Sequence, residues 1–180
     1  MNFLKLSVSV AAISLSVQAF AATQGTPGPT STGTVTINAT ITAEVNITNL
    51  NDFTFDATTL RTALNTGAAS SKTDAVCVWS NNVDGGYFIT ATGNGASNAF
   101  TLNDGTRTLP YTVNWTGTSG SATALTAGTK SAKFTSNATA PDCGGATTAT
   151  LGIGIANAAI ATMEATTTYT GVLTLLVSPT

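Results

Sequence analysis

Side chains able to perform acid–base or metal chemistry are few and scattered in this sequence. It contains no histidine, the side chain most often used as a base at neutral pH. No spacing singles out a pair of acids for glycoside hydrolysis, and no turn matches a calcium-ligand series. We therefore expect no enzymatic activity and no catalytic, cofactor-binding or metal-binding residue. Most of the acids lie in predicted turns, where a carboxylate caps its own backbone. The full set of eight acids is Glu44, Asp52, Asp56, Asp74, Asp84, Asp104, Asp142 and Glu164.

The two cysteines, Cys77 and Cys143, are the only ones in the chain. An even number of cysteines in an exported protein indicates a disulfide. Two cysteines without histidine cannot complete a four-ligand zinc site. We therefore predict a Cys77–Cys143 disulfide, which would stabilise the fold by about 4 kcal/mol in the chain-entropy description.

The first residues have the features of a signal peptide. A short segment with one lysine, Met1 to Lys5, precedes an apolar stretch from Leu6 to Val17. Small residues at Ala19 and Ala21 provide a cleavage site. We assign residues 1–21 to a signal peptide, with cleavage after Ala21 or one residue later. A membrane anchor is the alternative, but the apolar stretch is shorter than the roughly 20 residues that a spanning helix needs.

The composition favours strands and excludes some partners. Charged residues make up 8% of the chain, the formal net charge is −2, and 42% of the residues are apolar. The absence of a basic patch argues against nucleic acid as a partner. Threonine, alanine, glycine and valine are abundant, whereas residues that fill exposed helices are scarce. We expect a single all-β domain that works outside the cytoplasm.

The most informative segment runs from Val35 to Ile47. Apolar residues alternate there with threonine, asparagine and glutamate, which is the period of a β-strand with one buried face. A single strand of this length would run about 43 Å, longer than most strands. The pattern therefore predicts two strands, one from about Gly33 to Ala43 and another from about Val45 to Phe55.

The rest of the chain reads as short strands separated by turns, which favours a β-sandwich. Asp84-Gly85-Gly86 and Asn103-Asp104-Gly105 are turn signals. Gly152 and Gly154 indicate a close approach by a neighbouring backbone. Residues 56–71 read as a connection, 125–134 as a strand or irregular edge, and 157–165 as one helical turn. The expected strands are 75–79, 87–92, 100–102, 109–115, 148–155 and 169–177.

The last predicted strand, Tyr169 to Val177, reaches almost to the end of the sequence. Its inward side chains would be either Leu173, Leu175 and Val177 or the alternating set Val172, Thr174 and Leu176. An immunoglobulin-like sandwich has one further strand at this edge, and no sequence remains to form it. An uncovered edge is an aggregation hazard. We therefore expect a strand from elsewhere to cover it, with the N-terminal alternating segment as the source.

These features together resemble a chaperone–usher pilus subunit. The segment Thr34–Val45 is similar to the donor strand of alternative, class 5-type fimbrial subunits, and Tyr169–Leu175 has the pattern Tyr-x-Gly-x-Leu-x-Leu of a last pilin strand. The middle of the chain is similar to the archaic, spore-coat-U-like branch, through Cys77-Val78-Trp79-Ser80-Asn81, Leu109-Pro110-Tyr111 and Cys143.

The resemblance implies an all-β, incomplete immunoglobulin-like β-sandwich that lacks its last strand and is completed by donor-strand complementation. It implies an N-terminal extension at 22–43 and a pilin-like domain at 44–180. The donor side chains would be Val35, Ile37, Ala39 and Ile41. The acceptor edge would comprise Tyr169, Gly171, Leu173, Leu175 and Val177.

The same resemblance implies a function and partners. The chain would be a structural subunit of a bacterial surface fimbria, exported through the periplasm, with a role in adhesion and biofilm formation. Its partners would be a periplasmic chaperone, an outer-membrane usher, and identical or related subunits in a head-to-tail filament.

Two alternatives remain open. One is a self-contained secreted sandwich that binds surface carbohydrate through aromatic residues such as Trp79 or Trp115. The other is a matrix or coat protein that polymerises without a chaperone.

Overall fold

The computed structural model describes residues 22–180, so the predicted signal peptide lies outside the described residues. The described chain falls into two compact units, residues 22–41 and 42–180. Within this part of the chain, no helix is long and apolar enough to span a membrane. The elements are β1 (Val45–Thr48), α1 (Ala57–Thr66), β2 (Ser70–Ser80), β3 (Gly86–Gly93), β4 (Thr101–Asn103), β5 (Thr108–Pro110), β6 (Thr112–Thr116), β7 (Thr123–Ala124), β8 (Phe134–Thr135), β9 (Ala149–Ile155), α2 (Asn157–Ile160) and β10 (Leu173–Pro179), with 3₁₀ turns at Ala96–Asn98 and Cys143–Gly145.

The N-terminal unit is closed at one point by a pair of backbone hydrogen bonds. The amide of Thr23 donates to the carbonyl of Thr34 at 2.9 Å, and the amide of Thr34 donates back at 3.0 Å. Residues 35–41, which we call the arm, follow this bridge without regular secondary structure. Val35, Ile37 and Ile41 in the arm are 74%, 88% and 80% exposed.

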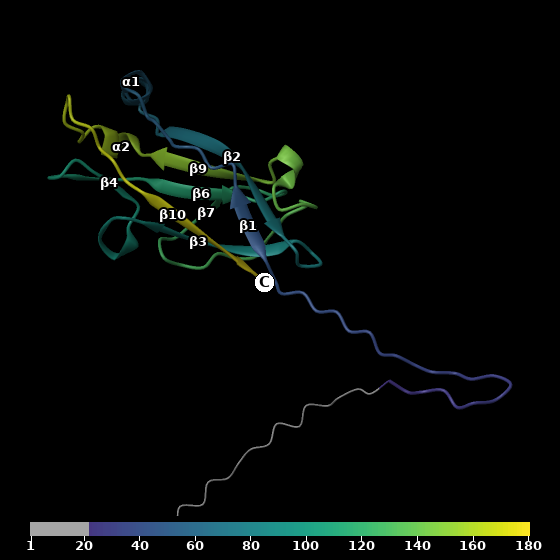
Figure 1. The fold of residues 1–180 in the computed structure, drawn as a ribbon. Helices are drawn as coiled ribbons and strands as arrows, with labels where there is room; N and C mark the ends of the chain where they lie inside the picture. Colours follow the sequence, from purple (N-terminus) through teal and green to yellow (C-terminus); the bar gives the residue numbers. More distant parts are fainter. Residues whose placement is uncertain (1–21) are drawn as a thin grey trace, which may run out of the picture. The chain divides into compact units, whose positions relative to one another are not determined.

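The larger unit is an immunoglobulin-like β-sandwich, as predicted. One sheet has the strand order β1-β2-β9-β6-β7 and the other β10-β3-β8, while β4 and β5 form a separate hairpin. All the pairings are antiparallel. Figure 1 shows β2, β9 and β6 running across one layer and β3 and β10 across the other. This arrangement leaves β1 and β10 as the end strands of their two sheets.

The core lies between the inward faces of these sheets. The indole nitrogen Nε1 of Trp115 on β6 donates to the hydroxyl of Tyr87 on β3 at 3.1 Å, and neither side chain is exposed. This hydrogen bond joins the two layers and satisfies both polar atoms, which would otherwise be costly to bury. The other fully buried side chains of the core include Val76, Val78, Ile89, Ala91, Leu109, Val113 and Ile155.

The predicted disulfide between Cys77 and Cys143 is present and joins residues 66 positions apart. Cys77 lies on β2, on the opposite face from Val76 and Val78, and is fully buried. The bond therefore fixes the loop that contains Cys143 over the outer face of β2. Hydroxyls of this loop complete the edge of β2, since Thr148 Oγ1 and Ser136 Oγ both donate to the carbonyl of Val78.

Two predicted glycine positions have clear steric reasons. Gly85 has φ +62°, and a Cβ there would lie 2.0 Å from the carbonyl oxygen of Ser136. Only glycine fits such a turn without strain. A Cβ at Gly154 would lie 2.8 Å from Thr112 Oγ1 on the paired strand β6. The close neighbour at Gly154 is therefore a side-chain hydroxyl rather than the backbone that the sequence predicted.

The prediction of a connection at residues 56–71 was wrong, because α1 occupies most of it. Asp56 caps the start of the helix by accepting from the amide of Thr59 at 2.8 Å. Gly67, with φ +69°, ends it in the left-handed conformation. The abundance of threonine hides this helix, because threonine is a weak helix former.

Several predicted strand limits also differ from the structure. The arm is not assigned as a strand, and the second predicted strand stops at Thr48 rather than Phe55. Strand β2 starts at Ser70 instead of residue 75, and Tyr111 interrupts the strand expected at 109–115. The last strand begins at Leu173, so Tyr169 and Gly171 precede it.

Candidate strand-docking seam

The outer edges of β1 and β10 lie next to each other and define a candidate site, which we call the seam. Strand β1 is paired on one side with β2, and β10 on one side with β3. Cα atoms of β1 and β10 approach within 8 Å, and across residues 22–180 no strand pairing joins them. Figure 1 shows β10, in yellow, with β1 beside its C-terminal end. Two unpaired strand edges therefore meet where the two sheets come together.

The inward side chains of the seam are only half-buried. Leu173, Leu175 and Val177 on β10 pack against the core, as do Val45 and Ile47 on β1, and all five keep an intermediate exposure. Their neighbours one strand further in, such as Ile89 and Val78, are fully buried. A row of apolar side chains therefore remains partly in water along the seam.

The register of β10 decides between the two faces that the alternation left open. Leu175 lies opposite Ala91 and Val177 opposite Ile89, both of which are buried residues on β3. Leu176 lies opposite Thr90 and is 61% exposed. The predicted acceptor residues Leu173, Leu175 and Val177 therefore face inward together.

The other two predicted acceptor residues have a different setting. Gly171 lies against β4, where an added Cβ would be 2.9 Å from the side chain of Leu102. Tyr169 packs on the core, and its hydroxyl accepts from the amide of Glu164 at 3.2 Å. Tyr169 and Gly171 therefore lie in the segment that precedes β10 and are not part of its edge.

Neither strand of the seam contains a charged residue. Edge strands of soluble proteins are normally protected by lysine, proline within the strand, or a covering segment. On β10 the only proline, Pro179, is the last residue. The seam therefore lacks the usual chemical protection against pairing with another strand.

Asn81, beside the start of β1, has a role that the sequence did not predict. Asn81 continues the β1–β2 ladder, because its amide donates to the carbonyl of Glu44 at 3.1 Å and its Oδ1 accepts from the amide of Glu44 at 2.8 Å. Its Nδ2 also donates to the carbonyl of Thr42 at 2.7 Å. We call these three hydrogen bonds between Asn81 and residues 42–44 the bracket. An asparagine at the end of a strand is typical of a turn, so the sequence alone gives no signal for it.

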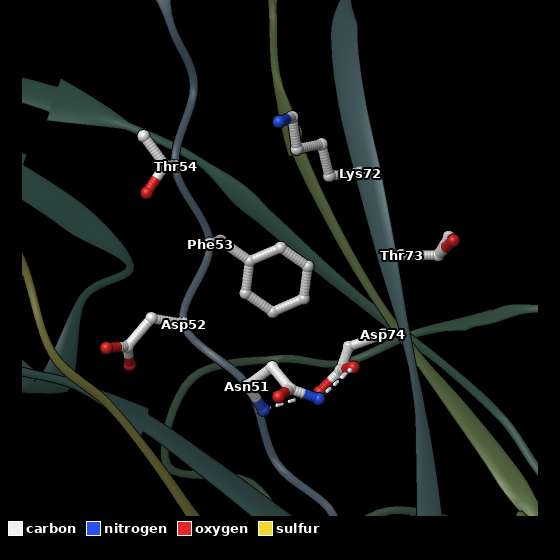
Figure 2. Close-up of a pocket in the computed structure, with 7 residues that line it drawn as sticks. All are labelled: Asn51, Asp52, Phe53, Thr54, Lys72, Thr73 and Asp74. Carbon is white, nitrogen blue, oxygen red and sulfur yellow. Dashed lines mark hydrogen bonds between the residues drawn. The ribbon is translucent and has the colours of Figure 1, made fainter.

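A shallow pocket of about 320 Å³ lies beside β2. Both the amide and Nδ2 of Asn51 donate to the carboxylate of Asp74, at 2.8 and 3.0 Å. Figure 2 shows these bonds below the ring of Phe53. Because the carboxylate of Asp74 is occupied in holding the segment after β1 against β2, this pocket has a structural explanation.

The carboxyl groups with altered pKa values are all in turns or caps. The amide of Thr59 holds the pKa of Asp56 below its ordinary value, Lys133 does so for Asp84, and the amide of Arg107 for Asp104. Among residues 22–180, no group of three or more potential metal ligands is gathered together. These acids stabilise local backbone, which is the role that their turn positions predict.

One of the two tryptophans suggested for carbohydrate binding is buried in the core. Trp115 has no exposed surface and its Nε1 is bonded to Tyr87. The suggestion for this residue was therefore wrong, because the alternation that places it on a strand also places it in the core. Trp79, on the outer face of β2, keeps an intermediate exposure.

No family model matches the sequence, and no curated protein matches it. Among solved structures, a similar chain comes from one described as a chaperone–tip adhesin complex vital for synergistic activation of CFA/I fimbriae biogenesis. The alignment covers 77% of this chain and 42% of that chain, with 14% identity and a TM-score of 0.47. This chain thus spans less than half the length of that protein, and similarity at this level assigns no function.

Proposed function

We propose that this protein is a structural subunit of a surface fimbria, and that it polymerises by inserting its arm into the seam of a neighbouring subunit. The observation that carries the proposal is the seam itself, where two uncharged, unpaired edges flank half-buried leucine, isoleucine and valine side chains. Strand addition uses such an edge for backbone hydrogen bonds and its apolar row for specificity.

The arm matches the seam in length and in chemistry. Residues 35–41 would extend about 23 Å as a strand, and β10 has the same length of 7 residues. The arm carries no charge, and Val35, Ile37, Ala39 and Ile41 share one face. The opposite face consists of Thr36, Asn38 and Thr40, which suit the solvent side of a sheet.

Burial of the arm would be favourable but requires a small opening. Each large apolar side chain transferred into the seam contributes about 1.5–3 kcal/mol. A strand placed between β1 and β10 needs about 9.6 Å between their axes, which is twice the usual strand spacing. Since these strands approach within 8 Å, they have to separate when the arm enters.

The contact would be heterologous, because the arm of one copy meets the seam of the next. Such contacts generate open filaments when the rotation from one copy to the next does not close a ring. In this proposal a periplasmic chaperone covers the seam before assembly, an outer-membrane usher exports the filament, and the mature subunits lie at the cell surface. The role is structural and needs no catalytic residue.

Two matched pairs of substitutions test the proposal in cells that express the full chain. Leu175→Asp and Ile37→Asp place a charge on the predicted contact faces, whereas Leu176→Asp and Asn38→Asp place it on the opposite faces. We expect the first pair to abolish polymers and the second pair to retain them, as measured by unboiled gel electrophoresis of surface extracts. Circular dichroism of each purified variant verifies folding.

A wild-type chain that never forms heat-resistant polymers would contradict the proposal, as would equal polymer loss in both members of a pair. Surface polymers that still form in cells lacking every periplasmic chaperone would instead support the coat-protein alternative.

A further inference from the structure

The sequence pattern allows the arm to fold back onto its own subunit. A hairpin with residues 42–44 as its loop would place Ile41 opposite Val45 and Ala39 opposite Ile47. All four apolar residues would then face inward, since Ile47 lies opposite the buried Val78. Three-residue loops are common in hairpins, and within residues 22–180 no strand pairs with the outer edge of β1. Self-capping of this kind would compete with polymerisation.

The bracket at Asn81 opposes this fold-back. Val45 lies opposite Ser80, and the hydrogen bonds of Asn81 extend this register by one residue to Glu44. The third bond, from Nδ2 to the carbonyl of Thr42, holds the segment one step further back. A turn at 42–44 would redirect these same backbone groups, so it would break the bracket.

The local sequence adds a second obstacle to the turn. The usual three-residue hairpin loop has its last residue in the left-handed conformation, which favours glycine or asparagine. Here that position is Glu44, and the loop would be Thr42-Ala43-Glu44. Glutamate adopts a positive φ at an energetic cost.

We infer that Asn81 is a positioning residue that keeps residues 42–44 extended and so reserves the arm for a second copy of the chain. The inference rests on the proposed function, because it concerns which seam receives the arm. Asn81 thereby controls whether the arm pairs with its own seam or with that of another copy. The bracket disfavours the intramolecular pairing without contacting the inserted residues.

Binding of a labelled peptide tests this inference. The peptide contains residues 33–43, and the full-length chain is kept at a concentration where the chain is monomeric. The wild-type seam is free and captures the peptide. Asn81→Ala removes both side-chain hydrogen bonds, and we expect capture to weaken by about tenfold because the chain's own arm now competes. Adding Glu44→Gly to this variant supplies the turn residue and should weaken capture further.

Two controls separate this effect from damage to the fold. Asn82→Ala removes a neighbouring asparagine that bonds Gly86 and Thr180 instead, and it should leave capture unchanged. Adding Ile37→Asp to Asn81→Ala disables the competing arm, so capture should return to the wild-type level.

Each result has a defined meaning. If the wild-type chain does not capture the peptide, the proposed function fails. If the wild type and Asn81→Ala capture it equally, the inference about Asn81 fails while the proposed function stands. If Ile37→Asp does not restore capture, the Asn81→Ala effect comes from structural damage and the inference is also overturned.

Discussion

At the scale of single residues, the bond from Trp115 to Tyr87 is a buried polar contact between the two layers. Its donor and acceptor are both inaccessible to water. A buried hydroxyl that loses its partner carries a desolvation penalty with no compensation. Burial raises the pKa of Tyr87, whereas the hydrogen bond from Trp115 acts in the opposite direction.

Replacing Trp115 with phenylalanine tests that contact. We expect the free energy of unfolding to fall by about 2–4 kcal/mol, because the substitution leaves a small cavity and an unpaired Tyr87 hydroxyl. Trp79→Phe on the outer face of β2 is the matched control and should change stability by less than about 1 kcal/mol. Urea unfolding followed by circular dichroism measures both, and similar losses would contradict the assigned role of Trp115.

Three exposed carboxyl groups predict how stability depends on acid. The pKa values of Asp56, Asp84 and Asp104 lie below the ordinary value of 3.8 in the folded protein, because each carboxylate accepts hydrogen bonds. Their contribution is therefore complete above that pH and is lost as the pH falls through the folded values. Thermal unfolding should show a falling midpoint below a pH of about 4. Asp56→Asn should reduce this dependence, and an unchanged profile would contradict the assignment.

At the scale of elements, alternation located strands better than it located their ends. The strand expected at 148–155 is present as β9, and Leu151, Ile153 and Ile155 on one of its faces are all buried. The alternation from Val35 to Ile47 continues without a break, yet pairing begins only at Val45. Period alone cannot show where the partner strand ends, and β2 ends at Ser80, opposite Val45.

The helix α1 and the Asn81 bracket were not predicted, because neither has a local sequence signal that distinguishes it from a loop. The caps of α1, Asp56 and Gly67, are visible in the sequence, but residues of this type are equally frequent in loops. Asn81 acts through Glu44, 37 positions away. Contacts between distant positions depend on the sheet register, which a single sequence does not reveal.

The arm and β10 are predicted to pair between subunits, and cysteine cross-linking can test this at the level of elements. A chain with Ile37→Cys mixed with one carrying Leu175→Cys should form an interchain disulfide under mild oxidation. Asn38→Cys should cross-link to Leu175→Cys at least fivefold less, because its side chain would point to the opposite face. Non-reducing electrophoresis measures the yield. Equal yields would show that the arm does not enter with the predicted face inward.

At the scale of the whole molecule, the Cys77–Cys143 disulfide links β2 of the sandwich covalently to the distant loop that contains Cys143. Closing a loop with a sequence separation of 66 should stabilise the fold by about 4 kcal/mol. The double variant Cys77→Ala and Cys143→Ala should lose most of this stability in urea unfolding. The wild-type protein treated with reductant is the control and should behave like the variant, and a loss below about 1 kcal/mol would contradict this estimate.

The bracket at Asn81 also has a mechanical consequence for a polymer. Tension along the arm would reach the domain at Glu44 and pass into β1 along its own axis. The four paired residues of β1 would then carry this load together in shear, rather than being peeled from β2 one at a time. In a fimbria built this way, flow at the cell surface would load the β1–β2 ladder of each subunit lengthwise, the direction in which a strand ladder resists rupture best.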